Sequence, residues 1–333
     1  MTTYEGFPNT RPFDDGYASM LHTLSEGSVH VHFDPYEDIE WDSPEFAVDV
    51  NDPRWVLSPK IDPLGATDWY QSLPLDRQIE IGRWRTLNAI RVGAAFESIL
   101  IRALMHYAIK LPNGSPEFRY CIHEMTEECN HIQMFQELVN RSQTDVPGMR
   151  PMFRRSAPLT GFLGGFFPVI LMIGILAGEE PIDHYQKSIM REGIEMPTAV
   201  LRTMEIHIAE EARHISFADE FLRLRLPKLN RVERAIVSVA FPITMRWLAG
   251  EIMTTPTSVQ RKLKIPRKVR REAFWGSDRS REIMASYFGD MRRLATDTGL
   301  MNSVSRRVWK WCGIDGEPSN YRGEPDRTAQ LVA

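Results

Sequence analysis

The sequence predicts an all-α protein in which a four-helix bundle core carries additional helices and an extended N-terminal arm. Apolar residues recur at three- and four-residue steps along several long segments, which is the period of a helix with one buried face. No alternating apolar pattern of useful length occurs, so strands are not expected. We divide the chain into an extended arm at 1–70, a helical domain at 71–300 and a C-terminal tail at 301–333.

The four bundle helices can be located from their apolar periods and from their start and stop residues. The first is expected from Pro74 to Lys110. Ser115 followed by Pro116 starts the second, because a capping serine and a proline in the first turn favour a helix N-terminus. In order, the four helices are expected at 74–110, 115–145, 157–191 and 196–227.

The segments on either side of this core differ in pattern. Residues 1–70 are rich in proline, aspartate and aromatic residues without a sustained helical period, so we expect an extended arm packed on the core. After the bundle, Asn230 and Glu233 form a capping box, which predicts a fifth long helix. Further helical segments are expected near 267–275 and 279–299.

Composition narrows the class of protein. The net charge of −4 gives no sign of nucleic-acid binding. Three cysteines without metal-ligand spacing fit a reducing cytoplasm, and the N-terminus lacks the basic start and apolar run of a secretory signal. The uncharged stretch from Ala157 to Gly178 is long enough to cross a bilayer. It contains five glycines and a central Pro168, so we interpret it as a buried bundle helix without stable membrane insertion.

Two Glu-x-x-His motifs carry most of the functional information. Residues three apart share one face of a helix, so each motif can offer an oxygen and a nitrogen to one metal ion. A single glutamate precedes the motif glutamates by 31 and 32 residues, in apolar segments where an unpaired carboxylate would be costly. Four helices that contribute such groups would enclose two metal ions, as in di-iron proteins. The candidate metal ligands are Glu97, Glu128, His131, Glu179, His207, Glu211 and His214.

The ligand on the third helix is chosen from two adjacent glutamates. Glu179 lies on the same side of the helix as the apolar residues that follow it, whereas Glu180 lies roughly opposite. We therefore choose Glu179 and keep Glu180 as the substitute, because Pro181 could kink the helix and rotate this face.

Residues near the two motifs have further expected roles. His207 lies one turn before Glu211 and is expected to be a third nitrogen ligand. Glu124 takes the matching position before the first motif. It is either a further ligand or exposed, and we favour exposure. Glu127 and Glu210 lie off the ligand face; each could hold the histidine of the other motif or be solvated, and both readings stay open. No catalytic residue beyond the metal ligands is predicted.

This pattern of four glutamates and three histidines resembles that of the ferritin-like di-iron oxygenases. Within them it is most similar to the p-aminobenzoate N-oxygenase family, which includes arylamine oxygenases of antibiotic biosynthesis. The distinctive point is His207, four residues before the second motif, and the resemblance covers about residues 75–250. It implies a ferritin-like fold, two iron ions, O2 as co-substrate and an external electron donor that re-reduces the iron.

Three functions are compatible with this pattern. The first is N-oxygenation of an arylamine or other small amine. The second is hydroxylation or desaturation of an aliphatic or acyl substrate, for which Gly161, Gly164 and Gly165 would leave room for an apolar tunnel. The third is ferroxidase activity or iron storage, which needs only the bundle, so the additional segments favour a closed substrate cavity. The sequence names neither the small-molecule substrate nor the redox partner, and a homodimer stays open.

Overall fold

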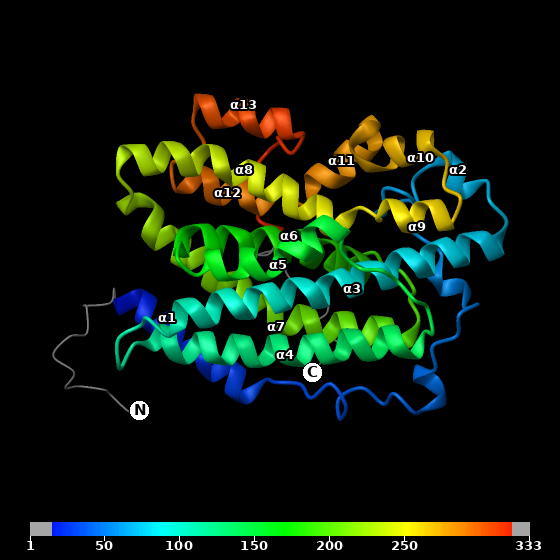
Figure 1. The fold of residues 1–333 in the computed structure, drawn as a ribbon, viewed down its shortest axis with the longest axis horizontal. Helices are drawn as coiled ribbons and strands as arrows, with labels where there is room; N and C mark the ends of the chain where they lie inside the picture. Colours follow the sequence, from blue (N-terminus) through cyan, green and yellow to red (C-terminus); the bar gives the residue numbers. More distant parts are fainter. Residues whose placement is uncertain (1–14, 322–333) are drawn as a thin grey trace.

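Four long helices form the centre of the fold (Figure 1), in a computed structural model that describes residues 15–321. Helix α3 packs along α4, and α6 packs along α7. No strand occurs in the described range, which confirms the all-α prediction. The first 14 residues of the expected arm and residues 322–333 of the expected tail lie outside it. The bounds are α3 (Leu75–Ala108), α4 (Pro116–Arg141), α6 (Pro168–Arg191) and α7 (Thr198–Arg225).

The expected third helix is divided into two, which corrects the prediction of one helix through 157–191. Helix α5 (Pro151–Gly164) ends at a bend, and α6 begins at Pro168. Proline disfavours a helical conformation in the residue before it, and Phe167 accordingly has φ −123° and ψ 79°. Pro181, by contrast, lies within α6 without ending it. The uncharged stretch therefore bends at 165–167 between α5 and α6.

Part of the N-terminal arm is helical, contrary to the prediction that it is extended. Helix α1 (Asp15–His30) packs on α4 and α7. Its buried residues Tyr17 and Leu21 are four residues apart, which is the spacing of one buried helix face. The following segment, 31–67, has only short helical turns and packs on the core as expected, with Trp55 buried. These short elements are η1 (Pro44–Phe46), η2 (Pro53–Trp55) and, at the end of the arm, α2 (Asp68–Gln71).

A close backbone approach fixes this arm to α3. A Cβ added at Gly82 would lie 1.9 Å from the main-chain oxygen of Trp55. We expect Gly82→Ala to lower the free energy of unfolding by at least about 1–3 kcal/mol, because backbone has to move to relieve the overlap. Urea unfolding measures the change. In the control Gly174→Ala, the added Cβ meets nothing within 4 Å, and stability should be unchanged or higher. Equal effects of the two substitutions would contradict the prediction.

The C-terminal third forms a second layer beside α6 (Figure 1). The expected capping box is present at Asn230 and Glu233, where α8 begins. The expected tail contains a helix with Trp309 buried, so it is part of the packed structure up to residue 321. The helices here are η3 (Leu226–Lys228), α8 (Arg231–Met253), α9 (Thr257–Lys262), α10 (Arg267–Arg271), a π-helical turn (Glu272–Gly276), α11 (Asp278–Ser286), α12 (Gly289–Asp297) and α13 (Ser303–Cys312).

Among the described residues, one helical stretch, Arg231–Lys262, is long and apolar enough to cross a membrane. This assignment as a candidate membrane span depends on the length and composition of the stretch alone. Of its most apolar window, 61% is buried inside the protein, and the core helix of a soluble protein passes the same test.

Two apolar clusters leave a polar gap in the middle of the bundle. In α4, one cluster ends at Met125 and the other resumes at Met134. In α7, one ends at Ile206 and the other resumes at Ile215. The Glu-x-x-His motifs lie inside these intervals, so the fold places them at the same level of neighbouring helices.

Candidate metal centre

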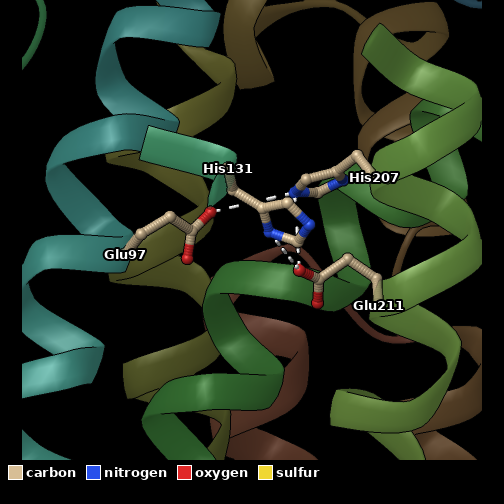
Figure 2. A group of neighbouring side chains, drawn as sticks. All are labelled: Glu97, His131, His207 and Glu211. Carbon is tan, nitrogen blue, oxygen red and sulfur yellow. Dashed lines mark ion pairs between the residues drawn. The ribbon is translucent and has the colours of Figure 1, made fainter. Parts of the chain in front are cut away.

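Among the described residues, the polar gap holds two overlapping groups of side chains from α3, α4 and α7 that could hold a metal ion. The first contains Glu97, His131, His207 and Glu211, each with one ligand atom within 4.8 Å of the others (Figure 2). The second contains Glu128, Glu211 and His214 under the same criterion. All of these residues are buried, and Glu211 belongs to both groups. The structure thus brings together six of the seven sequence-predicted ligands in these two groups.

Glu211 lies at the middle of the arrangement. Its Oε1 atom is 3.2 Å from His214 Nδ1, 3.5 Å from His131 Nδ1 and 3.5 Å from His207 Nε2. Glu128 contacts the two motif histidines through its two oxygens, at 3.1 Å to His131 and 3.0 Å to His214. The two motifs therefore face each other with their carboxylates between the imidazoles.

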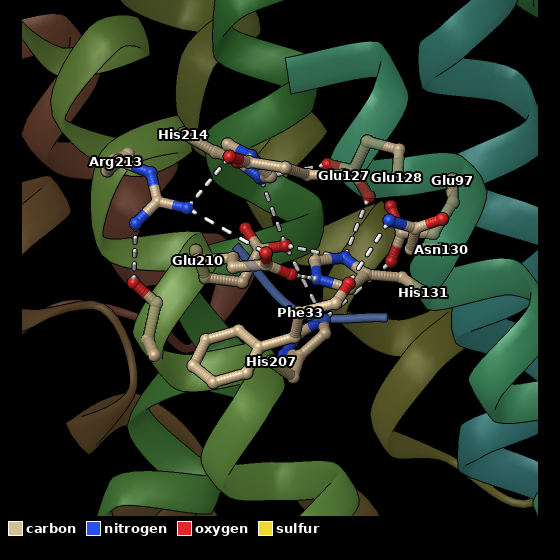
Figure 3. Close-up of polar contacts among 12 residues, drawn as sticks. Phe33, Glu97, Glu127, Glu128, Asn130, His131, His207, Glu210, Arg213 and His214 are labelled. Carbon is tan, nitrogen blue, oxygen red and sulfur yellow. Dashed lines mark hydrogen bonds and ion pairs between the residues drawn. The ribbon is translucent and has the colours of Figure 1, made fainter. Parts of the chain in front are cut away.

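The second ring nitrogen of each motif histidine contacts the outer glutamate of the other motif (Figure 3). Nε2 of His131 lies 2.8 Å from Glu210, and Nε2 of His214 lies 2.7 Å from Glu127. Of the two readings left open for these glutamates, the structure shows the cross-motif contact. When Nε2 donates to a carboxylate, Nδ1 carries the lone pair that a metal requires.

Gln186 is a neighbour of the centre that sequence reasoning missed. Its Oε1 atom lies 2.9 Å from His207 Nδ1, and its side chain is buried. If Nδ1 donates this hydrogen bond, His207 presents Nε2 towards Glu97 and Glu211. A usable signal was its position seven residues after Glu179, two turns along the same helix face.

Glu179 lies beside these groups, although it is outside both of them. Burial is the main cause that raises the pKa of Glu179 well above the ordinary value. The negative charges of Glu211 and Glu128 raise this pKa further, so both carboxylates lie near Glu179. It lines the cavity that Glu97 and His207 also line. Glu180 is equally buried but does not line this cavity. The role of Glu179 as a ligand stays a prediction.

Glu124 is fully buried, so the expectation that it is exposed was wrong. It precedes Glu128 by one helical turn and therefore shares its inward face. Neither carboxylate oxygen has a hydrogen-bond partner among the described residues, and burial raises its pKa well above the ordinary value. The physical reason is the wide buried face of α4, which packs on both α3 and α7.

The buried carboxylates of the centre are suited to a bound cation. Burial, followed by the charges of neighbouring glutamates, raises the pKa of Glu97 well above its usual range. One oxygen of Glu97 and one of Glu211 have no hydrogen-bond partner within the described chain. Burial opposes protonation of His131, yet hydrogen bonds from its ring to the carboxylates of Glu128 and Glu210 raise its pKa to about 10. Carboxylates crowded in this way are stable when metal ions neutralise them. A mixed oxygen and nitrogen donor set suits iron.

The arm covers the outer side of the centre (Figure 3). Asn130 Nδ2 donates to the main-chain oxygen of Phe33 at 3.2 Å. Arg213 donates to the main-chain oxygen of Val31 at 3.0 Å and to Glu127 at 2.8 Å. The cation of Arg213 thus holds Glu127 ionised: burial opposes ionisation, but His214 and Arg213 lower the pKa of Glu127 to about 2.

Removal of either outer carboxylate should weaken metal binding. We expect Glu127→Ala and Glu210→Ala each to reduce ferrous-ion affinity by about 10–100-fold, because the opposite histidine loses the group that fixes its tautomer and orientation. An anaerobic competition titration with a chromogenic chelator measures the affinity. Glu205→Ala, in a surface pair with Arg202 on the same helix, is the control and should bind iron as the parent does. Unchanged affinity in both outer variants would refute the assignment.

Two cavities reach the centre. A small one of about 60 Å³ lies against Glu97, Glu179 and His207. A larger one of about 330 Å³ lies between α3, α5, α6 and α8 and ends at Glu179. Both are lined by Phe96, Gly178 and Glu179, so these residues separate the larger cavity from the histidines.

Comparisons with known proteins agree with this geometry. Two proteins, Uncharacterized protein Mb0909 of Mycobacterium bovis and Uncharacterized protein Rv0885 of Mycobacterium tuberculosis, are each 55% identical to this chain over 314 residues. In each case the match covers 94% of this chain and 92% of the relative. No solved structure matches the chain. The family model described as P-aminobenzoate N-oxygenase AurF matches residues 14–299. The chain therefore belongs to the p-aminobenzoate N-oxygenase AurF family.

Proposed function

We propose that the protein is a non-haem di-iron oxygenase that uses O2 to oxygenate a small organic substrate. The observation that carries this proposal is the pair of buried side-chain groups that share Glu211, next to a cavity that ends at Glu179. Family membership supports it, because the family is one of di-iron oxygenases. The residues that would hold the iron are Glu97, Glu128, His131, Glu179, His207, Glu211 and His214.

Two bound ferrous ions would supply the electrons and the adjacent metal sites needed to activate O2. The protein side chains prepare this site. Glu210 and Glu127 would hold the Nε2 protons of His131 and His214, which leaves both Nδ1 atoms free to coordinate. The covering arm and the apolar walls would exclude water from the reacting centre.

The first candidate reaction is N-oxygenation of an arylamine or other amine, the activity named in the family description. For one oxygen atom transferred, R–NH2 + O2 + 2 e− + 2 H+ gives R–NHOH + H2O. The external donor provides both electrons in this balance. The second candidate is hydroxylation or desaturation of an aliphatic or acyl chain, and the apolar lining of the larger cavity favours it. Ferroxidase or storage activity would not need this cavity.

Oxygen consumption tests the function. Protein loaded anaerobically with about two ferrous ions per chain is supplied with a chemical reductant and O2, with p-aminobenzoate or dodecanoate as substrate. Formation of a hydroxylamine or of an oxidised acyl chain, with matching oxygen uptake, is the expected result. Iron oxidation without product from either compound, followed by retention of ferric mineral, would instead favour ferroxidase or storage activity.

We further propose a cytoplasmic location, because Cys121, Cys129 and Cys312 are all free thiols. An external donor is needed in either oxygenase reaction. Cell fractionation checks the location, and size-exclusion chromatography distinguishes a monomer from a homodimer.

A further inference from the structure

The larger cavity is suited to an apolar chain and not to a charged ring. Among the described residues that line it, the only charged one is Glu179 at its inner end. Most of the others are aliphatic, aromatic or glycine. Its volume of about 330 Å³ is at the lower end of the range for small-molecule sites. A carboxylate placed inside would lose its hydration without gaining a partner, which is costly.

Beside this cavity lies a polar pocket of about 310 Å³, formed by the end of α8 and the segments that follow it. Trp247 lines both the apolar cavity and the polar pocket, and its side chain is partly exposed. Phe153, which lines the cavity, packs its ring edge to face with Trp247 at 5.3 Å. One molecule could therefore extend past Trp247 and occupy both spaces.

The polar pocket carries an excess of positive charge. It is lined by Arg150, Arg246 and Arg270, against one carboxylate, Glu251. Arg150 pairs with that carboxylate at 3.1 Å. In the described part of the chain, no carboxylate lies within ion-pair distance of Arg246 or Arg270. Arg270 donates from one Nη atom to Gln260 at 3.3 Å. The guanidinium of Arg246 and the other donors of Arg270 are thus available to an anion from outside.

Two hydrogen-bond donors in this pocket lack partners. The Nε atom of Arg270 and the indole Nε1 of Trp275 are buried without a hydrogen-bond acceptor among the described residues. An anion bound in this pocket could accept hydrogen bonds from both donors. Arg246 is held beside them, with its guanidinium 3.7 Å from the centre of the Trp275 ring.

Backbone strain also occurs at this pocket. Trp275 has φ 72°, in the left-handed region that non-glycine residues seldom adopt. This conformation is strained, and residues that adopt it cluster at ligand and active sites. It interrupts the π-helical turn Glu272–Gly276 and brings the indole to the pocket wall.

We propose that these adjoining spaces bind an anionic amphiphile, with its aliphatic chain in the apolar cavity and its anionic head group on Arg246, Arg270 and Trp275. The far end of the chain then lies at Glu179. Binding of the amphiphile does not depend on the proposed function. Only oxidation of the chain at its Glu179 end rests on that function. This proposal selects the aliphatic candidate over the arylamine and assigns the arginine pocket to recognition of a carboxylate or a phosphate.

Equilibrium dialysis tests the binding without any turnover. The full chain, loaded with iron and kept anaerobic, is dialysed against radiolabelled dodecanoate, dodecyl phosphate or dodecanol below their micelle concentrations. We expect both anions to bind at least about tenfold more tightly than the alcohol, as one charge-assisted hydrogen bond would provide. Comparison of the two anions identifies the preferred head group.

Matched variants divide the site into its two parts. Arg246→Gln with Arg270→Gln should lower dodecanoate affinity to that of dodecanol and leave dodecanol binding unchanged. Arg261→Gln, an exposed arginine outside the pocket, is the control. Gly174→Leu should weaken both ligands, because an added Cβ there meets nothing within 4 Å and the side chain would fill the cavity. Val232→Leu on the exposed face of α8 is its control. Circular dichroism verifies that each variant is folded.

Equal binding of dodecanoate and dodecanol by the parent protein, or no binding of either, would overturn the proposal. Loss of dodecanol binding in the folded double arginine variant would overturn the division into chain and head-group sites. Dodecanoate binding, with no oxygen consumption on either dodecanoate or p-aminobenzoate, would retain the amphiphile site and refute the oxygenase. Oxygen consumption with p-aminobenzoate, and no binding of dodecanoate, would retain the oxygenase and refute the amphiphile site.

Discussion

Glu211→Ala should reduce the iron content of reconstituted protein from about two ions per chain to fewer than one. Glu211 belongs to both groups of side chains that could hold a metal ion, and all three histidines of the centre lie within 3.5 Å of its Oε1 atom. Its loss removes an oxygen ligand from each group and leaves a buried space that alanine does not fill. The binding of both ions should therefore be weakened together. Replacement of a ligand that belongs to only one group should weaken the binding of one ion.

Iron determination after anaerobic loading and desalting measures this effect. Glu220→Ala is the matched control, because Glu220 lies on the same helix but is exposed. It should retain the iron content of the parent. If Glu211→Ala, folded by circular dichroism, still bound about two ions, the shared-ligand arrangement would be wrong.

The helices of the metal centre could be predicted because their signals are local. The spacing in Glu128-x-x-His131 and Glu211-x-x-His214 specifies one face of a helix, whatever packs against it. The same holds for the capping box at Asn230, which starts α8. Helix α4 also starts at Ser115-Pro116 as predicted, although the Ser115 side chain makes no capping hydrogen bond. The family resemblance drawn from these residues is confirmed over residues 14–299.

Features that depend on contacts between distant segments could not be predicted in this way. Glu124 is buried because α1, α3 and α7 all pack on α4, and the sequence of α4 does not contain that information. The hydrogen bond between Gln186 and His207 joins two helices, so neither residue alone indicates it. The bend at 165–167 was missed because the apolar composition continues through it, although Pro168 follows directly.

The cavities are the least local feature. The walls of the larger cavity come from four helices, and its glycines could be related to that space only because α5 and α6 are separate helices. Gly174 opens into free space, whereas a Cβ at Gly165 would lie 2.6 Å from the side chain of His106. One glycine thus leaves room for a ligand, and the other allows close packing of two helices.

Replacement of the adjacent glutamates on α6 should separate a metal ligand from its neighbour. We expect Glu179→Ala to retain at most about one iron per chain and Glu180→Ala to retain about two. Glu179 lies near Glu211 and Glu128, whose charges raise its pKa further after burial, and it lines the cavity shared with Glu97. Helix α6 continues through Pro181, so the face that presents Glu179 is preserved.

The pair is well matched, because both side chains are 3% exposed and both substitutions remove one buried carboxylate from the same turn. Any change in folding stability caused by replacing a buried glutamate with alanine at this level of α6 should therefore be similar in the two variants. Iron content and competition with a chelator are measured side by side on protein that is helical by circular dichroism. Loss of iron only in Glu180→Ala would assign the ligand role to Glu180. Glu179, at the inner end of the larger cavity, would then not be a metal ligand. Equal loss in both variants would mean that the α6 carboxylates act on the centre through their charge and not through coordination.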